Sequence, residues 1–239
     1  MKNTSWGKTY HWGEYQRDLI LPNILRLLNI KKGEVILDLG CGAGLFTKEF
    51  LNAGAQVIGV DVSKDLIALA KTNANSGKFY VGSADRLNFL EDNSINKITI
   101  ILAIQNMENI SSVFMECRRV LKNGGKLFLV MNHPAFRIPK ASGWEWDDQI
   151  KTQYRRLDSY MSETTEKIRM HPGDQPEATT ISFHRPLQIY FKSLSKSGFC
   201  VTKLEEWISN KKSEPGPRAK AEDVARKEFP LFLFLESSS

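Results

Sequence analysis

A short apolar segment that runs into three alternate glycines constrains the fold of this 239-residue chain most strongly. The segment is Val35-Ile36-Leu37-Asp38-Leu39-Gly40-Cys41-Gly42-Ala43-Gly44, and residues 46–52 behind it have the pattern of a helix. Such an apolar run is typical of a strand buried on both faces. Glycines permit a tight turn and close approach of a ligand, and a helix start offers free N–H donors. The segment therefore predicts a strand–loop–helix unit that binds a nucleotide-like ligand.

Strands and helices alternate on both sides of this unit. Further strands are expected at residues 56–60, 78–81, 97–104 and 126–131, and helices at 17–28, 64–73 and 112–121. Ser63 is a plausible cap for the second of these helices, and Asn123-Gly124-Gly125 is expected to end the third. This order predicts an α/β fold with a doubly wound, mostly parallel sheet and right-handed crossovers.

The alternation stops between His133 and Phe183, in a stretch rich in aromatic and charged residues. We interpret residues 133–185 as an insertion over the edge of the sheet. A helix at 186–196 and strands at 199–207 and 229–235 complete the pattern, with a polar loop and a short helix between the strands. The chain is thus expected to form one domain, with an N-terminal helical flap (1–30), a core (31–132), a lid (133–185) and a C-terminal part of the sheet (186–239).

Composition narrows the class of protein. Cys41, Cys117 and Cys200 are far apart and odd in number, which disfavours a disulfide framework or a zinc site; no metal is expected. No apolar run approaches the roughly 18 residues of a membrane span, and the first residues lack the apolar stretch of a signal peptide. A cytoplasmic protein without a membrane partner is expected. The net charge of +6 is spread without a dense basic run, which disfavours nucleic acid as a partner without excluding it.

An acidic residue stands where a ribose-binding carboxylate is needed. Asp61 ends the second strand about 20 residues after Gly40, the spacing at which an acid accepts ribose hydroxyls. Dinucleotide sites prefer G-x-G-x-x-G, whereas the glycines here are at 40, 42 and 44. Asp38 would place like charges beside a pyrophosphate, and it suits a ligand with a cationic amino-acid end. The charge argument favours S-adenosylmethionine over NAD.

At this point the sequence resembles the class I S-adenosylmethionine-dependent methyltransferase family, in its small-molecule branch. Residues 35–44 are similar to its first motif, and Gly59-Val60-Asp61-Val62-Ser63 to its second. Gly82-Ser83-Ala84-Asp85 resembles the third, and Leu121-Lys122-Asn123-Gly124-Gly125 the turn before strand five, with Asn123 where Pro is commoner. Ser182-Phe183-His184-Arg185-Pro186 also resembles the small-molecule branch. The resemblance implies a seven-stranded sheet with an antiparallel last strand and a lid after strand five.

The residues expected to bind the cofactor lie in these motifs. Ordinary roles stay open for some of them: Asp38 could bond to loop N–H groups, and Asp85 could cap a short helix. Val62 would pack on the adenine, and Arg86 would offer its backbone N–H. The full set is Asp38, Gly40, Cys41, Gly42, Gly44, Asp61, Val62, Asp85, Arg86 and Ala103.

The acceptor side is expected at the carboxyl ends of the strands and in the lid. Among His133, His171 and His184, His133 is the preferred general base because it follows strand five. The expected substrate-binding residues are Arg137, Trp144, Tyr154 and His184, although the aromatic ones could instead form the lid's own core. Gln105 and Asn106, after strand four, could touch the acceptor or simply form a loop. Tyr10, His11 and Tyr15 could fold over the cofactor.

These features predict an enzyme that transfers the methyl group of S-adenosylmethionine to an oxygen, nitrogen or carbon atom of a small-molecule acceptor. An RNA or protein methyltransferase is the first alternative. A non-catalytic S-adenosylmethionine-binding module and an NAD-dependent oxidoreductase are further alternatives. The identity of the acceptor and the oligomeric state stay open.

Overall fold

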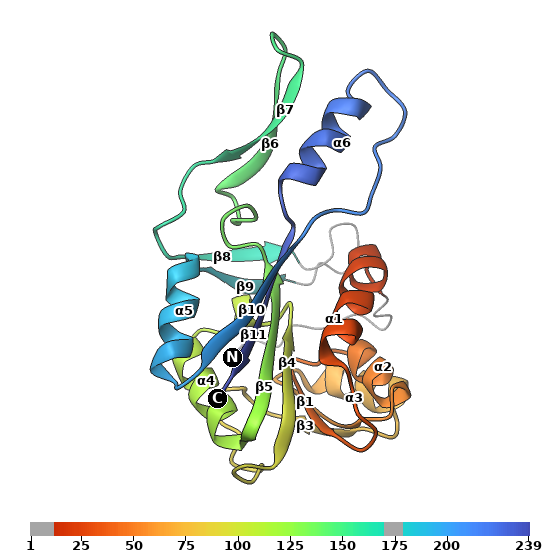
Figure 1. Ribbon diagram of the computed structural model, residues 1–239, viewed down its shortest axis with the longest axis vertical. Helices are drawn as coiled ribbons and strands as arrows, with labels where there is room; N and C mark the ends of the chain where they lie inside the picture. Colours follow the sequence, from red (N-terminus) through yellow and green to blue (C-terminus); the bar gives the residue numbers. More distant parts are fainter. Residues whose placement is uncertain (1–11, 170–178) are drawn as a thin grey trace.

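A seven-stranded sheet forms the centre of the computed structural model, which describes residues 12–169 and 179–239 (Figure 1). Within the sheet, β11 runs antiparallel to both of its neighbours and the other described pairs run parallel, which confirms the α/β fold. The order across the sheet is β10 (Cys200–Trp207), β11 (Phe232–Ser238), β5 (Leu121–Asn132), β4 (Ile95–Ile101), β1 (Val35–Leu39), β2 (Gln56–Asp61) and β3 (Lys78–Val81).

Helices cover both faces of the sheet because successive strand residues point to opposite sides. Ile36 packs with η1 (Gln16–Ile20), α1 (Leu21–Leu28) and α2 (Leu45–Asn52) on one face. Leu37 and Leu39 pack with α4 (Ile110–Val120) and α5 (Leu187–Lys196) on the other. The remaining helices are α3 (Lys64–Asn73), which packs near β2 and β3, and α6 (Ala219–Glu228). No helix in the described ranges is long and apolar enough to cross a bilayer.

Several predicted boundaries near strand four are wrong. The strand ends at Ile101 rather than at residue 104, because Leu102 takes a left-handed conformation (φ 52°) and the chain turns into η2 (Ile104–Asn106). The helix after it begins at Ile110, where the Asn109 side chain accepts the N–H of Ser112. This helix ends at Val120, and β5 already begins at Leu121, so that Asn123-Gly124-Gly125 lies within a strand rather than ending the helix.

The insertion contains regular structure that the sequence did not predict. It forms two antiparallel hairpins, β6 (Ser142–Asp147) with β7 (Thr152–Leu157), and β8 (Thr164–Arg169) with β9 (Thr179–His184). In Figure 1 the first hairpin projects away from the sheet beside α6, whereas the second lies close to the sheet. The last strand also begins later than expected, at Phe232, because Phe229 packs against Phe136 and Trp144 instead.

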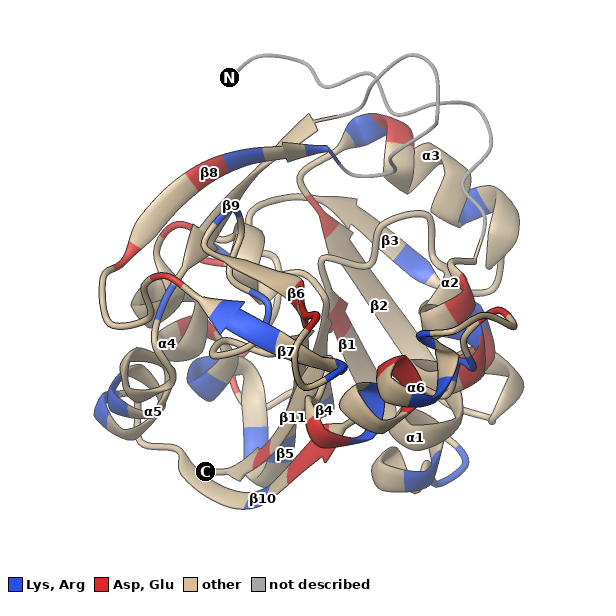
Figure 2. Ribbon diagram, turned by 90° about the horizontal axis from the view of Figure 1, so that it is seen from above, with Lys and Arg blue, Asp and Glu red and all other residues tan. Residues whose placement is uncertain are grey.

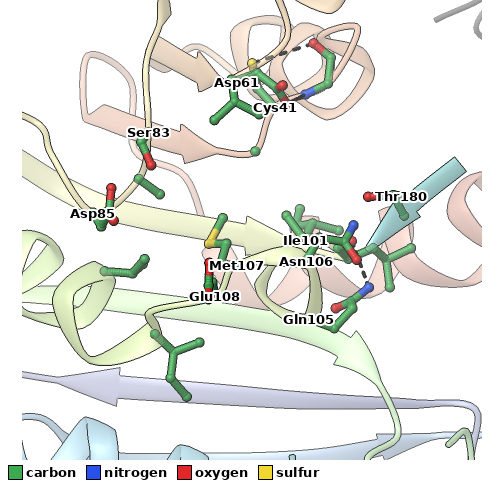
Figure 3. Close-up of a pocket in the computed structure, with 18 of the residues that line it drawn as sticks. Cys41, Asp61, Ser83, Asp85, Ile101, Gln105, Asn106, Met107, Glu108 and Thr180 are labelled. Atoms are coloured by element: carbon green, nitrogen blue, oxygen red, sulfur yellow. Dashed lines mark hydrogen bonds between the residues drawn. The ribbon is translucent and has the colours of Figure 1, made fainter. Parts of the chain in front are cut away.

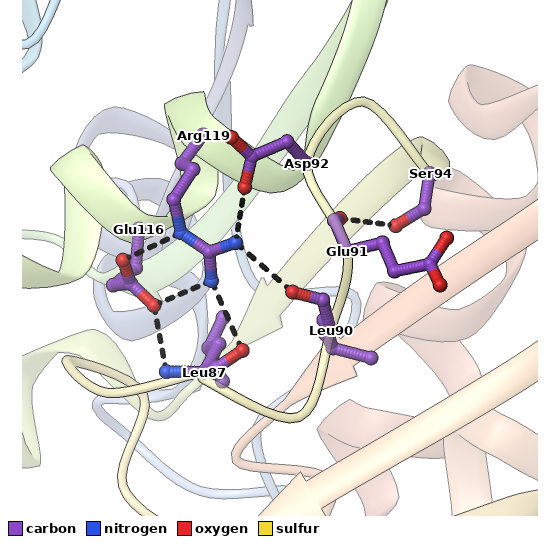
Figure 4. Close-up of polar contacts among 7 residues, drawn as sticks. All are labelled: Leu87, Leu90, Glu91, Asp92, Ser94, Glu116 and Arg119. Carbon is purple, nitrogen blue, oxygen red and sulfur yellow. Dashed lines mark hydrogen bonds and ion pairs between the residues drawn. The ribbon is translucent and has the colours of Figure 1, made fainter.

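A guanidinium fixes the loop between β3 and β4 (Figure 4). Arg119 of α4 donates to the carbonyls of Leu87 and Leu90 and to Glu116 and Asp92, over 2.6–3.0 Å. Glu116 in turn accepts the N–H of Leu87. This network holds the turn that follows Asp85 against the body of the protein.

We expect Arg119→Met to lower the free energy of unfolding by about 1–3 kcal/mol, because two loop carbonyls lose their donors. Urea unfolding of both proteins measures this change. Arg118→Met, one position earlier on α4 and outside the network, is the matched control. Equal losses for the two variants would show that the network does not stabilise the loop.

Candidate active site

A cavity of about 1070 Å³ opens at the carboxyl ends of β1, β2 and β4. Its walls come from the glycine loop, the ends of β2 and β3, η2 with the start of α4, and the β8–β9 hairpin. Figure 3 shows Asp61 and Cys41 in one region, Ser83 and Asp85 in another, and Gln105 and Asn106 beside Thr180. This is the edge at which open parallel sheets bind ligands.

The glycine loop takes backbone conformations that favour glycine. Gly40, Gly42 and Gly44 have φ of 73°, 55° and 76°. A Cβ at position 40 would stand 2.5 Å from the Cβ of Ala103, and one at position 44 would stand 3.0 Å from that of Ala70. The loop can therefore lie close to α3 and to the turn between β4 and η2 only because these side chains are missing.

Asp61 links the end of β2 to the glycine loop. Its Oδ2 accepts the N–H of Gly42 at 3.0 Å, and its Oδ1 accepts that of Ser63 at 2.9 Å. Burial raises the pKa of the Asp61 carboxyl, and these backbone donors oppose the shift. Each carboxylate oxygen keeps a second acceptor site, so Asp61 can still receive two ribose hydroxyls.

Asp38 lies beneath the loop rather than in the cavity wall. Its side chain is 2% exposed and accepts hydrogen bonds from the hydroxyls of Thr47 (2.6 Å) and Thr99 (3.0 Å). Burial raises the pKa of the Asp38 carboxyl to about 6, although both hydroxyls oppose this shift. The structure thus shows a buried acid whose contacts are threonine hydroxyls, not the loop N–H groups considered from the sequence.

The raised pKa gives a signed prediction for stability. A carboxyl with a pKa of about 6 when folded and about 3.9 when unfolded favours folding below pH 4, and this contribution is lost as the pH rises through 6. Asparagine at this position does not titrate. We expect Asp38→Asn to gain stability relative to the unmodified protein between pH 5 and pH 8 by about 1.4 kcal/mol, roughly half of the total change, because the other half is already lost below pH 5. Urea unfolding at both pH values measures it; a pH-independent difference would contradict the assignment.

The far part of the cavity has a different chemical character. β9 lies against η2, and Thr180 faces Gln105 and Asn106 there (Figure 3). Gln105 donates through Nε2 to the carbonyl of Leu102 at 2.8 Å, which turns its Oε1 away from that bond. Gln105 Oε1 and Asn106 Oδ1 are buried without a hydrogen-bond partner. Buried acceptors in this state are suited to a ligand that donates hydrogen bonds.

The structure brings most of the predicted cofactor residues together. Those that line the cavity are Gly40, Cys41, Gly42, Asp61, Val62, Asp85 and Ala103. Gly44 and Arg86 are not among the lining residues; Gly44 packs on Ala70 instead. Burial raises the pKa of the Cys41 thiol, so Cys41 is a packing residue rather than a nucleophile.

The prediction of His133 as a general base is corrected. His133 is 5% exposed and does not belong to the cavity wall. Its Nδ1 accepts the N–H of Ala135, so Nε2 carries the proton and donates to Glu206 at 2.8 Å. Burial lowers the pKa of His133, and Glu206 opposes this. Both ring nitrogens are engaged, and neither faces the cavity.

The predicted substrate residues also lie elsewhere. Arg137 stacks over Phe232, and Trp144 packs on Phe229. Tyr154 shares the projecting β6–β7 hairpin, and His184 bonds to the carbonyl of Tyr160. None of the four lines the cavity. Trp144 and Tyr154 are 36% and 43% exposed, so they do not form a buried core of the lid either.

The predicted N-terminal flap is tested only in part. Tyr10, His11 and His171 lie outside the described residues. Tyr15 hydrogen-bonds to Ser209 and packs against Phe232 rather than lining the cavity. Its neighbour Gln16 does line the cavity.

Sequence reasoning missed several wall residues, namely Gln16, Phe46, Glu163, Ile168, Arg169, Thr180 and Arg185. Residues 164–169, which form β8, contain a single apolar residue, Ile168, so no alternation of apolar residues indicated this strand. No local pattern marks which of these side chains meet across the cavity.

The fold and the site together define a class of protein: a doubly wound nucleoside-binding α/β domain. Comparisons with known protein families and solved structures define this class more closely. Residues 37–129 match the family described as "Methyltransferase domain". A crystal structure of an S-adenosylmethionine-dependent methyltransferase from Mesorhizobium loti superposes with a TM-score of 0.71, covering 91% of this chain and 96% of that one at 24% identity.

Two curated relatives show how far the sequence similarity extends. An uncharacterized protein of Haemophilus influenzae is 29% identical over 77% of this chain and 74% of its own length. A ubiquinone biosynthesis O-methyltransferase of Nitrobacter winogradskyi is 41% identical over 43% of this chain. The chain spans 40% of that relative's length. Residues 37–129 thus match a methyltransferase domain, and the sheet order and the superposition show that the chain has the fold of an S-adenosylmethionine-dependent methyltransferase.

Proposed function

We propose that this protein transfers the methyl group of S-adenosylmethionine to an oxygen, nitrogen or carbon atom of a small-molecule acceptor. The observation that carries this proposal is the division of one cavity into two chemically different parts. The glycine loop and Asp61 form one part. η2 and the β8–β9 hairpin form the other.

The residues of the first part fit the family's cofactor. Asp61 retains free acceptor sites for ribose hydroxyls, and the neighbouring Gly42 borders open space, since a Cβ there would have nothing within 4 Å. Val62 is 72% exposed and lines the cavity, so that it offers an apolar surface for an adenine ring. When bound, the cofactor supplies an electrophilic methyl group on a sulfonium.

The second part can hold and orient a nucleophile. Methyl transfer is an in-line displacement that depends chiefly on alignment. Gln105 Oε1 and Asn106 Oδ1 can accept hydrogen bonds from a hydroxyl or amino group and so direct its lone pair towards the methyl carbon. The name of the relative from Nitrobacter winogradskyi, a ubiquinone biosynthesis O-methyltransferase, indicates a small-molecule acceptor for that enzyme. This supports a small-molecule acceptor for the present protein, but it does not identify that acceptor.

Charge gives weak support to the RNA alternative. Seen from above, basic and acidic segments are interspersed over the helices and hairpins on this face (Figure 2). Binding to a polyanion would favour a continuous basic surface.

Methyl-labelled S-adenosylmethionine, incubated with the purified protein and fractionated cell extract, tests the proposal. We expect label in a small-molecule fraction. Label confined to RNA or protein would contradict the proposed acceptor class. Cofactor binding without transfer to any fraction would indicate a non-catalytic module.

A further inference from the structure

An arginine that the methyl-transfer mechanism does not use is buried in the acceptor part of the cavity. Arg185 follows β9, lines the cavity and is only 6% exposed. Its Nη2 donates to the carbonyls of Met107 and Glu108 at 2.9 and 2.6 Å, and its guanidinium lies 5.0 Å from the centre of the Phe183 ring. These contacts hold the guanidinium in one orientation.

The charge of Arg185 is poorly compensated. The carboxylate nearest to it in the described contacts, that of Glu163, is 3.8 Å from Nε, and its side chain is 56% exposed. The neighbouring Tyr190 is a buried phenol whose pKa burial raises; the charge of the Arg185 guanidinium and a hydrogen bond to it oppose this shift, but a neutral phenol does not balance the charge. Nη1 is buried and has no hydrogen-bond partner. A buried cationic donor without a partner is costly, and a ligand that accepts from Nη1 would remove this cost.

Arg185 is also linked through the backbone to Gln105 and Asn106, whose side-chain oxygens are unpartnered. It binds the carbonyl of Met107, the residue that directly follows η2, and η2 carries Gln105 and Asn106. Nη1, Gln105 Oε1 and Asn106 Oδ1 are all buried and unpartnered. The wall of one cavity therefore contains a residue with an unpartnered cationic donor and two residues with unpartnered acceptor oxygens.

We propose that Arg185 is a specificity-determining residue that binds a carboxylate of the methyl acceptor, while Gln105 and Asn106 accept hydrogen bonds from its hydroxyl or amino group. This inference rests on the proposed function and narrows its substrate class to small organic acids. A guanidinium matches a carboxylate because its planar donors point in fixed directions. Arg185 takes no part in bond making.

Calorimetry with benzoate and benzamide tests this, because the two probes have similar shapes and differ in charge. The protein is first saturated with S-adenosylhomocysteine. We expect benzoate to bind at least about tenfold more tightly than benzamide, as one charge-assisted hydrogen bond suggests. Equal affinities, or no binding of either probe, would overturn the inference.

Substitutions of Arg185 test whether this residue causes the preference for benzoate over benzamide. Arg185→Gln should abolish the preference for benzoate, and Arg185→Lys should retain part of it. Arg155→Gln is the matched control, since Arg155 also donates to a backbone carbonyl and stacks on an aromatic ring, but outside the cavity wall. A preference that persists in Arg185→Gln would overturn the proposal.

The two proposals fail in distinguishable ways. An unchanged affinity for S-adenosylhomocysteine shows that Arg185→Gln is folded. If that variant does not fold, the wild-type comparison and Arg185→Lys still decide the matter. If S-adenosylhomocysteine does not bind the unmodified protein, the proposed function fails, and the probes titrated into the cofactor-free protein still test Arg185.

Discussion

Asp61→Ala is expected to weaken the binding of S-adenosylmethionine by about 10- to 100-fold. The estimate follows from the loss of two ribose hydrogen bonds worth about 1–1.5 kcal/mol each. The structure adds a second cause in the same direction. The N–H groups of Gly42 and Ser63 lose their acceptor, so the glycine loop is also held less firmly.

Isothermal titration calorimetry measures this effect, and Asp65→Ala is its control. Asp65 is an exposed residue in the first turn of α3 and lies outside the cavity wall. Its replacement should leave the dissociation constant unchanged. An Asp61→Ala variant that binds as tightly as the unmodified protein would remove Asp61 from the cofactor site.

Gly40→Ala is expected to abolish measurable cofactor binding and to destabilise the protein. The new methyl group would stand 2.5 Å from the Cβ of Ala103, and the backbone at φ 73° already costs an L-residue about 1–2 kcal/mol. Gly40 and Ala103 both line the cavity. The clash between them must therefore displace part of the cavity wall.

Gly124→Ala is the control that separates the steric clash with Ala103 from the energetic cost of a positive φ. Gly124 has nearly the same φ, 74°, with nothing within 4 Å of the added Cβ, and it lies outside the cavity wall. This variant should lose stability but bind the cofactor normally. The double variant Gly40→Ala/Ala103→Gly should recover part of the binding, since the second change removes the opposing atom. No recovery, with normal folding, would show that the contact is not the cause.

Local signals predicted the sheet and the cofactor side of the site. The segment from Val35 to Gly44 contains its own strand, turn and helix start, and Asp61 reaches the loop because β1 and β2 are neighbours. These features depend on short-range patterns and on the regular geometry of parallel strands.

The acceptor side depends on contacts between distant segments. Arg185 reaches the carbonyl of Met107 only because β9 folds back against η2. His133 stood at a plausible strand end, but tertiary packing pairs it with Glu206 of β10. Neither outcome has a local sequence signal, so the cofactor loop was predictable and the acceptor wall was not.

Calorimetric titration of the purified protein with S-adenosylmethionine and, separately, with NADH tests the central claim most directly. The account predicts saturable binding of one S-adenosylmethionine per chain, competition by S-adenosylhomocysteine, and no binding of NADH. Heat of binding with NADH, or none with S-adenosylmethionine, would contradict it.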